Sequence, residues 1–408
     1  MPDKTITLLL AGGVGSRLHP LTSERAKPAV PFGGKYHIID FSLSNCLHSG
    51  LRRVLVLTQY KSLSLQKHLR DGWSIFNPSL GEYITPVPAQ MRVGSSWYAG
   101  TADAVYQNLY LLKRSGAPLT LILPGDHIYR MDYQAMIKMH REQKADISIA
   151  CLRVPKVEAS RFGTLSVDHD QRILDFQEKP ENPATLPDDS TQSLVSMGIY
   201  IFSTELLCEI VRNDHANSAS SHDFGMDILP GLVHNYKVSA YQFGGERGRV
   251  SNDQYWRDVG TIDAYFDANM DLLKPQPLLD MYQAEWPIRT CEIQAPPART
   301  VSLDNKNSLI VNSILNSGSI VNSAHINHSI LSANVRVEPD AQIENSIIFD
   351  NVVIEQGAKL QNCIVDKNCR VPTGIRIGYD HQVDKKHFKI SKNGITVVPE
   401  HWCGYSAK

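Results

Sequence analysis

An apolar residue recurs every six positions in the last quarter of the chain, and this period constrains the fold more than any other feature. A hexapeptide period predicts a left-handed parallel β-helix, in which each coil of three short strands stacks one apolar residue per face on the next coil. An irregular β-sandwich, the alternative, would alternate with a period of two. The breaks between the runs indicate imperfect coils or small insertions. The residues on the six-spacing are Ile314, Ile320 and Ile326, then Val337 and Ile343, then Ile348, Ile354 and Leu360, then Val365, Val371 and Ile377.

The first 150 residues show a different pattern, in which apolar runs alternate with helix-period stretches. This alternation is typical of βαβ units around a mostly parallel sheet, so the predicted class is α/β. Strands are expected at 5–10, 53–58, 119–123 and 146–152, and one helix is expected from Thr101 to Arg114. Prolines then crowd into a segment without periodicity from Pro275 to Pro297. We therefore expect a first domain over 1–275, a linker over 276–300 and the β-helix over 301–408.

Length and composition narrow the classes of partner. A chain of 408 residues is too long for one ordinary domain, and 41 Lys+Arg against 42 Asp+Glu give a formal net charge of −1. That balance argues against a general nucleic-acid or membrane binder, because both depend on basic excess. The sequence contains no bilayer-spanning apolar stretch and no cleavable leader, and its seven cysteines are scattered. We expect a cytoplasmic protein with reduced thiols. Any anionic ligand would be held by a few local groups and not by the overall charge.

A glycine-rich turn follows the first expected strand directly. Gly12, Gly13 and Gly15 would let backbone N–H groups approach phosphate oxygens, and Arg17 adds a planar cation suited to a pyrophosphate. The dinucleotide fingerprint is excluded because Leu18 stands where its third glycine is required, and no Walker pattern is present. Taken alone, this stretch could also be a bare glycine turn.

Two carboxylates are candidates for a metal site. Asp126 comes just after the apolar run Leu121–Leu123, and the carboxyl end of a buried parallel strand faces the ligand crevice of such a sheet. A hard oxygen ligand there suits Mg²⁺ that is coordinated to phosphates. Asp258 is the second candidate, and the fold must bring it close. Either residue, taken alone, could be a solvated turn residue.

Two Lys-Pro pairs suggest oriented ammonium groups. Pro28 and Pro180 disfavour the helical conformation for the residues before them, so Lys27 and Lys179 are expected to be extended. Glu178, next to Lys179, could accept hydrogen bonds from sugar hydroxyls. The alternative for this second pair is an ordinary surface Glu-Lys contact.

The stretch from Leu10 to Phe41 resembles the signature GGxGxRLxPLTxxxxKPxxP of the sugar-phosphate nucleotidyltransferases. Further motifs are similar to those of the bacterial members that form ADP-glucose, along nearly the whole chain: WYAGTADAVYQN, GDHIYRMDY, FQEKP, SMGIYIF, SSHDFG and YWRDVGT. The resemblance implies a GT-A-like, Rossmann-like α/β domain followed by the β-helix. It also implies adenylyl transfer from ATP to glucose 1-phosphate, with Mg²⁺, giving ADP-glucose and pyrophosphate for glycogen synthesis. A homotetramer regulated by phosphorylated metabolites is expected by the same analogy.

Roles for single residues also follow from the resemblance. The glycine loop would hold the nucleoside triphosphate, Arg17 and Lys27 would neutralise the departing pyrophosphate, and Lys179 would align the nucleophile. Asp126 and Asp258 would carry the metal. The remaining implied contacts are Gln59, Trp97, Gly100 and Thr101 for ATP, and Tyr98, Gly163, Glu178, Lys179 and Ser196 for glucose 1-phosphate.

The sequence departs from this family at three positions. Enteric members have basic residues where this chain has Glu24 and His37, and a carboxylate repels sugar bisphosphates. We therefore expect weak or altered activation by fructose 1,6-bisphosphate, while Arg25 and Arg114 could still hold an anion such as AMP. Met226 replaces the usual Lys, and nothing in the sequence explains this change.

Three alternatives remain open at this point. The chain could be a catalytically silent regulatory subunit, although Arg17, Lys27, Asp126, Lys179 and Asp258 are all intact. It could be a nucleotidyltransferase for another base or sugar. It could be an acyltransferase that uses His325 or His328 of the β-helix as a base. A hydrolase triad of Ser221, His222 and Asp223 is rejected, because neighbours in sequence have the wrong geometry for a triad.

Overall fold

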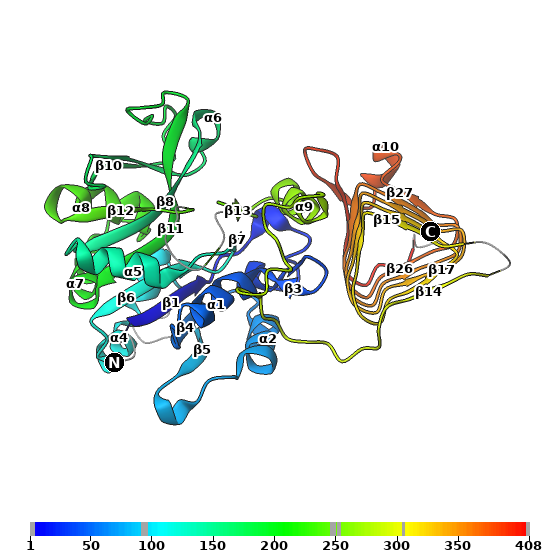
Figure 1. The fold of residues 1–408 in the computed structure, drawn as a ribbon, viewed down its shortest axis with the longest axis horizontal. Coiled ribbons are helices and arrows are strands. Elements are labelled where there is room, and N and C mark those ends of the chain that lie inside the picture. The colour runs from blue at the N-terminus through cyan, green and yellow to red at the C-terminus, as the bar shows by residue number, and fades with distance from the viewer. Residues whose placement is uncertain (1–4, 91–96, 245–249, 251–253, 304–306, 405–408) are drawn as a thin grey trace.

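The chain folds into an α/β domain and a β-helix that lie next to each other along the long axis of the molecule (Figure 1). The structure is a computed structural model that describes residues 5–90, 97–244, 250, 254–303 and 307–404. No helix in this described part is long and apolar enough to cross a membrane.

The α/β domain is built on a nine-stranded mixed sheet, with a central path of β10-β9-β11-β6-β1-β4-β5; β8 also pairs with β11, and β12 pairs with β8. Strands β1, β4, β5 and β6 are mutually parallel, which confirms the predicted mostly parallel sheet, and β11 runs antiparallel to β6 and β8. The strands are β1 (Thr5–Ala11), β4 (Arg53–Thr58), β5 (Tyr83–Pro88), β6 (Leu119–Pro124), β8 (Ile147–Pro155), β9 (Gly163–Val167), β10 (Ile173–Glu178), β11 (Gln192–Ser203) and β12 (Val238–Gln242).

Two apolar clusters cover the two faces of this sheet. Ile6 and Leu8 of β1 belong to one cluster, and Leu9 belongs to the other, as the alternation of side chains along a strand requires. The helices are α1 (Ile38–His48), α2 (Leu63–Trp73), α3 (Thr101–Tyr106), α4 (Leu109–Ser115), α5 (Tyr133–Glu142), α6 (Lys156–Ala159), α7 (Thr204–Ala216), α8 (Leu229–Asn235) and α9 (Ile262–Met270). Two short strand pairs, β2 (Pro31–Phe32) with β3 (Tyr36–His37) and β7 (His127–Tyr129) with β13 (Trp256–Asp258), complete the domain.

The single helix predicted from Thr101 to Arg114 is wrong, because the structure has two helices there. Helix α3 ends at Tyr106 and α4 begins at Leu109. Asn108 lies at the break, where its side-chain amide donates to the carbonyl of Ala104 at 2.8 Å and to the Tyr98 hydroxyl at 2.9 Å. An Asn side chain that bonds locally in this way competes with helical backbone bonds.

Three parallel sheets form the β-helix, as the hexapeptide period predicts. One contains β14 (Arg299–Val301), β17 (Ile320–Asn322), β20 (Arg336–Val337), β23 (Val353–Ile354) and β26 (Arg370–Val371). The second contains β15 (Leu309–Val311), β18 (His325–Asn327), β21 (Gln342–Glu344), β24 (Lys359–Gln361) and β27 (Arg376–Ile377). The third contains β16 (Ile314–Leu315), β19 (Ile330–Leu331), β22 (Ile347–Ile348), β25 (Cys363–Val365), β29 (Thr396–Val398) and the antiparallel β28 (Lys389–Ile390), with α10 (His381–Asp384) inserted before β28.

The breaks in the hexapeptide period lie at one corner of the coil. Ile343 pairs with Leu360 on the next coil, and Leu360 pairs with Ile377, so each turn is about one residue shorter than three perfect hexapeptides. The short step runs from β21 to β22 and from β24 to β25, where Asn345 and Asn362 have φ values of 43° and 48°. Asn tolerates this left-handed conformation, and the Asn345 amide donates to Asn362 Oδ1 at 2.5 Å.

The predicted stack is off by one residue in the first coil. Pairing of β16 with β19 and of β17 with β20 aligns Leu315 with Leu331 and Val321 with Val337, and these four side chains belong to the apolar interior. Ile320 instead pairs with Arg336 on the outer row. Ile314 packs against the α/β domain. The six-spacing could not separate two adjacent apolar residues.

This register generates a stability prediction. Leu331→Ala should lower the free energy of unfolding by about 2–5 kcal/mol, because Leu331 is fully buried and its loss leaves a cavity. Ile320, an isomer of leucine on the outer row, is the matched control. Ile320→Ala should lower the free energy of unfolding by about 1 kcal/mol or less. Urea unfolding of the full chain measures both. Equal losses for the two variants would contradict the register.

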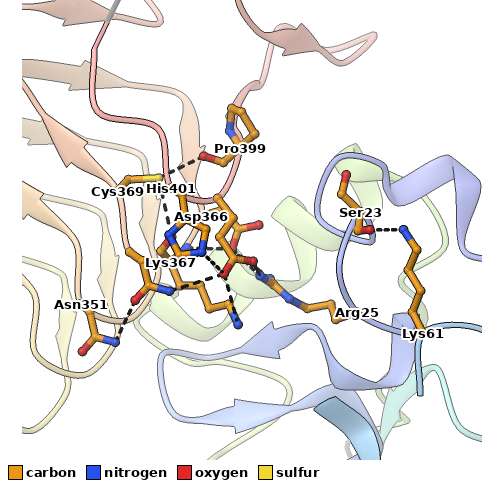
Figure 2. Close-up of polar contacts among 11 residues, drawn as sticks. Ser23, Arg25, Lys61, Asn351, Asp366, Lys367, Cys369, Pro399 and His401 are labelled. Atoms are coloured by element: carbon orange, nitrogen blue, oxygen red, sulfur yellow. Dashed lines mark hydrogen bonds and ion pairs between the residues drawn. The ribbon is translucent and has the colours of Figure 1, made fainter. Parts of the chain in front are cut away.

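An apolar face of the β-helix packs against the α/β domain. Ile330, Ile347 and Ile364 of successive coils share one cluster with Phe41 of α1 and Phe266 of α9. Ion pairs from Arg25 to the β-helix add to this contact (Figure 2). The contact fixes the two domains relative to each other, because the shared cluster is buried.

The segment between the domains is packed rather than free. Residues 275–298, all of which are described, contain no helix or strand. Trp286 is 1 % exposed, and its indole N–H donates to Asn45 Oδ1 of α1 at 2.9 Å. Arg130 donates to the carbonyl of Asp280 at 2.7 Å. These contacts hold the segment against the α/β domain.

Candidate active site

A cavity of about 560 Å³ opens at the carboxyl ends of three parallel strands. Leu10 and Ala11 of β1, Leu57 of β4 and Pro124 of β6 contribute to its wall. Open parallel sheets bind ligands at this edge. Of the residues predicted from the sequence, Gly12, Gly13, Lys27, Gln59, Tyr98, Gly100, Thr101, Asp126 and Glu178 line the cavity.

The glycine loop connects β1 to a short 3-10 turn over Ser16–Leu18. Gly15 has φ +65°, and a Cβ atom there would lie 3.1 Å from Lys27 Cβ and from Thr22 Cγ2. The Thr22 hydroxyl donates to the Gly15 carbonyl at 2.9 Å. Glycine is therefore required at position 15 for its backbone conformation and for its close approach to Lys27.

Arg17 is not among the described residues that line the cavity. Its side chain is exposed, and a Cβ atom built on Gly260 would lie 3.0 Å from Arg17 Nη2 and 3.0 Å from Asp258 Oδ1. The guanidinium and the Asp258 carboxylate thus flank Gly260. Arg17 is therefore next to the charged floor of the site.

Lys27 forms the centre of the charged floor. Its ammonium nitrogen lies 2.6 Å from Asp126 Oδ2 and 3.3 Å from Asp258 Oδ1. The antiparallel pair of β7 and β13 aligns Asp258 with His127, which brings position 258 next to position 126. Three segments that are far apart in the sequence therefore converge on one ammonium group.

The two carboxylates determine the charge state of this cluster. Burial alone would lower the pKa of Lys27, whose residue is 6 % exposed, but the charges of Asp126 and Asp258 raise it. Burial would raise the pKa of Asp126, but Lys27 and His127 lower it to about 2. The cluster thus contains a charged ammonium and an ionised Asp126 carboxylate at neutral pH.

The same carboxylates fit a divalent cation. Ligand atoms of Asp126, His127 and Asp258 all lie within 4.8 Å of one another. Carboxylate oxygens are the ligands that hard cations such as Mg²⁺ prefer. The Lys27 ammonium lies against both carboxylates, so a cation would share them with Lys27 or displace it.

The expected extended conformation of the two lysines before proline is wrong. Lys27 is the first residue of a 3-10 turn over Lys27–Ala29, and Lys179 has a left-handed φ of 46°. Carboxylates orient both ammonium groups instead. Lys179 Nζ lies 2.6 Å from Glu178 Oε1, and its side chain is 61 % exposed, outside the described lining of the cavity.

Glu178 marks the part of the cavity where the sequence predicts a sugar site. A Cβ atom on Gly163 or on Gly225 would lie 2.7 Å from Glu178 Oε2, so both glycines leave room for the carboxylate. Ser196 is buried in β11 beside an irregularity in the pairing of that strand, and its hydroxyl accepts from the Gly198 N–H at 3.2 Å. Gly163 and Ser196 therefore support the wall, and Gly198 lines it.

The cavity wall also contains residues predicted to contact the nucleotide. Gln59 accepts from the Tyr98 N–H at 2.9 Å, and both side chains line the wall. Trp97 is 56 % exposed and stacks on Tyr60 with ring centroids 5.3 Å apart, and only Tyr60 of this pair lines the cavity. Thr101 begins α3 and donates its hydroxyl to Asp223 Oδ2 at 3.1 Å.

The wall also contains residues to which the sequence alone assigned no individual role, among them Tyr60, Gly198, Tyr200, Asp223 and Gly225. The motifs SMGIYIF and SSHDFG contain four of them, so the signal was available. The loop that contains Asp223 lies against α3, where a Cβ atom on Gly100 would lie 2.2 Å from the carbonyl oxygen of His222. Such long-range contacts are not visible in a single sequence.

Ser221, His222 and Asp223 do not form a triad. His222 Nδ1 lies 2.8 Å from Asp214 Oδ2, and the Ser221 hydroxyl donates to Asp227 Oδ2 at 2.5 Å. Asp223 accepts from the Gly225 N–H at 2.9 Å as the cap of the following turn. The three side chains thus have separate structural partners.

The candidate effector residues lie in different environments. Glu24 is exposed, whereas Arg25 is buried against Asp366 and Glu400 of the β-helix. Arg114 is in the last turn of α4, far from the β-helix (Figure 1).

His37 and the three remaining candidates are also apart from the cavity. The ring of His37 lies 4.0 Å from that of His68, and burial lowers the pKa of His37 to about 3. Met226 is 64 % exposed, and the structure gives no reason for its presence. His325 is exposed on β18, and His328 Nδ1 lies 2.8 Å from the Asn312 amide at a coil corner.

Comparison with known proteins assigns this site to a family. A family model described as "Nucleotidyl transferase" matches residues 6–275, and one described as "GlmU-like, C-terminal hexapeptide" matches residues 296–398. A "Glucose-1-phosphate adenylyltransferase 2" of Vibrio parahaemolyticus is 58% identical over 97% of this chain and 98% of its own. A similar protein of Vibrio vulnificus is 60% identical over the same shares, and a "Glucose-1-phosphate adenylyltransferase" of Methylococcus capsulatus is 46% identical over 97% of this chain and 93% of its own. The chain therefore belongs to the nucleotidyl transferase family and, within it, to the glucose-1-phosphate adenylyltransferases.

Proposed function

We propose that this chain transfers the adenylyl group of ATP to glucose 1-phosphate, giving ADP-glucose and pyrophosphate. The observation that supports this most is the Lys27 ammonium between the Asp126 and Asp258 carboxylates, at the floor of a cavity beside a glycine loop. Full-length relatives at 58% and 60% identity have the same reaction in their names. Oriented charges around phosphates are what phosphoryl and nucleotidyl transfer require.

The reaction is a single displacement. A phosphate oxygen of glucose 1-phosphate forms a bond to the α-phosphorus of ATP, and the bond from that phosphorus to the pyrophosphate oxygen breaks. The N–H groups of Gly12 and Gly13 would hold the triphosphate, and Lys27 and Arg17 would neutralise the leaving pyrophosphate. Lys179, freed from Glu178, would align the attacking phosphate. Catalysis in this scheme depends on positioning and charge, with no protein nucleophile.

Asp126 and Asp258 would hold a divalent cation, which we propose is Mg²⁺. When bound, Mg²⁺ supplies positive charge at the α-phosphate and orients its oxygens. The chain's own contribution is to keep the Asp126 carboxylate ionised, for which Lys27 provides the charge in the structure. Glu178 would accept hydrogen bonds from glucose hydroxyls in the cavity.

Regulation and assembly are part of the proposal. Arg25 and Arg114 are the candidate sites for phosphorylated metabolites, and the exposed Glu24 disfavours sugar bisphosphates by repulsion. An effector at Arg25 would compete with Asp366 and Glu400. A homotetramer is the expected assembly, and the exposed apolar side chains of Leu309 and Val311 on β15 provide surface for it.

A nucleotide panel tests the proposed specificity. The full chain is incubated with Mg²⁺, glucose 1-phosphate and each nucleoside triphosphate in turn, and released pyrophosphate is measured. ATP should give the highest kcat/KM, because Gln59, Gly100 and Thr101, which are the proposed nucleotide contacts, line the cavity. Omission of glucose 1-phosphate is the control for simple hydrolysis. Equal rates with all nucleotides would contradict the proposal, and no release with any would favour the silent subunit.

Substitution of the metal candidate tests the charged floor. Asp126→Asn should lower kcat by about 10²–10³-fold, because it removes a charge at the reacting phosphate while leaving the fold intact. Asp170→Asn, at an exposed turn, is the matched control and should leave kcat unchanged. Steady-state kinetics and circular dichroism of both variants provide the measurement. A turnover of Asp126→Asn close to that of the unchanged chain would remove Asp126 from the mechanism.

A further inference from the structure

A buried charge cluster joins the two domains close to the proposed active site. Arg25 Nη1 and Nη2 each lie 2.9 Å from Asp366 Oδ1, and Nη2 lies 2.8 Å from Glu400 Oε2 (Figure 2). The side chains of Arg25 and Asp366 are 4 % and 2 % exposed. One guanidinium of the α/β domain thus spans two carboxylates of the β-helix.

Both carboxylates are held within the last coils of the β-helix. Asp366 follows β25, and its Oδ1 accepts from the Lys367 N–H at 2.7 Å. Glu400 follows β29, and its Oε1 lies 3.4 Å from Lys367 Nζ and 3.1 Å from His401 Nε2. These contacts are drawn in Figure 2. The β-helix therefore holds both carboxylates in place for the guanidinium.

Only one residue separates Arg25 from Lys27. Ala26, between them, is 1 % exposed and is the cap of the 3-10 turn that contains Lys27. The Ala29 N–H donates to the Ala26 carbonyl at 2.9 Å, which closes the turn. Because this segment is buried and hydrogen-bonded, a shift of Arg25 would move the backbone of Lys27 as well.

The same segment also supports the glycine loop. Gly15 packs against Thr22 and Lys27, with 3.1 Å from a Cβ atom built on the glycine to each side chain. The fork geometry of a guanidinium that bridges two carboxylates fixes its direction more sharply than a single ion pair does. The alternative is that Arg25 only holds the domains together.

We propose that Asp366 and Glu400 of the β-helix are positioning residues for the active site: they hold Arg25, and Arg25 sets Lys27 between Asp126 and Asp258. The inference rests on the proposed function for its effect on turnover. The β-helix would then contribute to adenylyl transfer from outside the cavity, through one buried arginine.

The test uses two variants of the full chain, Glu400→Gln and Arg25→Gln. Glu400→Gln is the milder one, because Glu400 is 14 % exposed and glutamine keeps a carbonyl oxygen there. Both should lower kcat by about tenfold or more with KM for glucose 1-phosphate nearly unchanged, since small displacements of a positioned group cost up to ~10²-fold in rate. Asn316→Ala is the control, because the Asn316 amide also joins the domains, at 2.8 Å from the Gly34 carbonyl, away from Lys27.

A second measurement does not need turnover. Trace acetylation with acetic anhydride, read by mass spectrometry, reports how accessible the Lys27 nitrogen is. Lys27 is 6 % exposed and its nitrogen is covered by the two carboxylates, so release from them exposes the nitrogen to the reagent and raises the labelled fraction. Acetylation of Lys27 should rise in Glu400→Gln and Arg25→Gln and stay unchanged in Asn316→Ala. A purely structural role would lower the melting temperature and leave this reactivity as it is.

Each outcome decides the proposal. Unchanged acetylation of Lys27 in the folded Glu400→Gln protein overturns it, whatever turnover does. Raised acetylation with kcat within about twofold of the unchanged chain also overturns it, because Lys27 would then move without consequence. If the unchanged chain lacks adenylyl transfer, the proposed function fails, and acetylation alone decides whether the β-helix holds Lys27.

Discussion

The ammonium of Lys27 between two carboxylates is the interaction on which the rest of the site depends. Lys27 is buried, and without Asp126 and Asp258 its charge would be costly at that depth. The cluster in turn requires the β7 and β13 pair to bring Asp258 to the end of β6, and requires glycine at position 15 so that the loop can approach. The sheet, the glycine loop and the β7–β13 pair therefore all position groups around the Lys27 ammonium.

Much of the architecture could be predicted from local pattern. The six-residue period predicted the β-helix because each coil repeats the same local environment, and the parallel sheet followed from the alternation of strands and helices. The errors came from contacts between side chains. The break between α3 and α4 depends on Asn108 reaching Ala104 and Tyr98, and the register of Ile320 depends on pairing with Arg336 on the next coil.

The active site likewise contains residues that could be predicted from local pattern and residues that could not. Asp126 could be predicted from its place after a buried strand, and the glycine loop from its place after β1. Most other roles came from resemblance to a family, since nothing local indicates that Asp258 joins Asp126. The prolines after Lys27 and Lys179 predicted an extended backbone that neither lysine has. The directions of the two side chains are determined by their carboxylate partners instead. The position of Arg25 against the β-helix is likewise a long-range property.

The proposed reaction is a direct displacement that uses charge and position without a protein nucleophile. The stereochemical course at the α-phosphorus tests this most directly. ATP with one sulfur at a chiral α-phosphorus is converted to the ADP-glucose analogue that keeps the sulfur on the same phosphorus, and the configuration of this product is determined by phosphorus NMR. A single in-line transfer predicts inversion at phosphorus, and net retention would contradict the account, because it would require a covalent enzyme intermediate and two displacements.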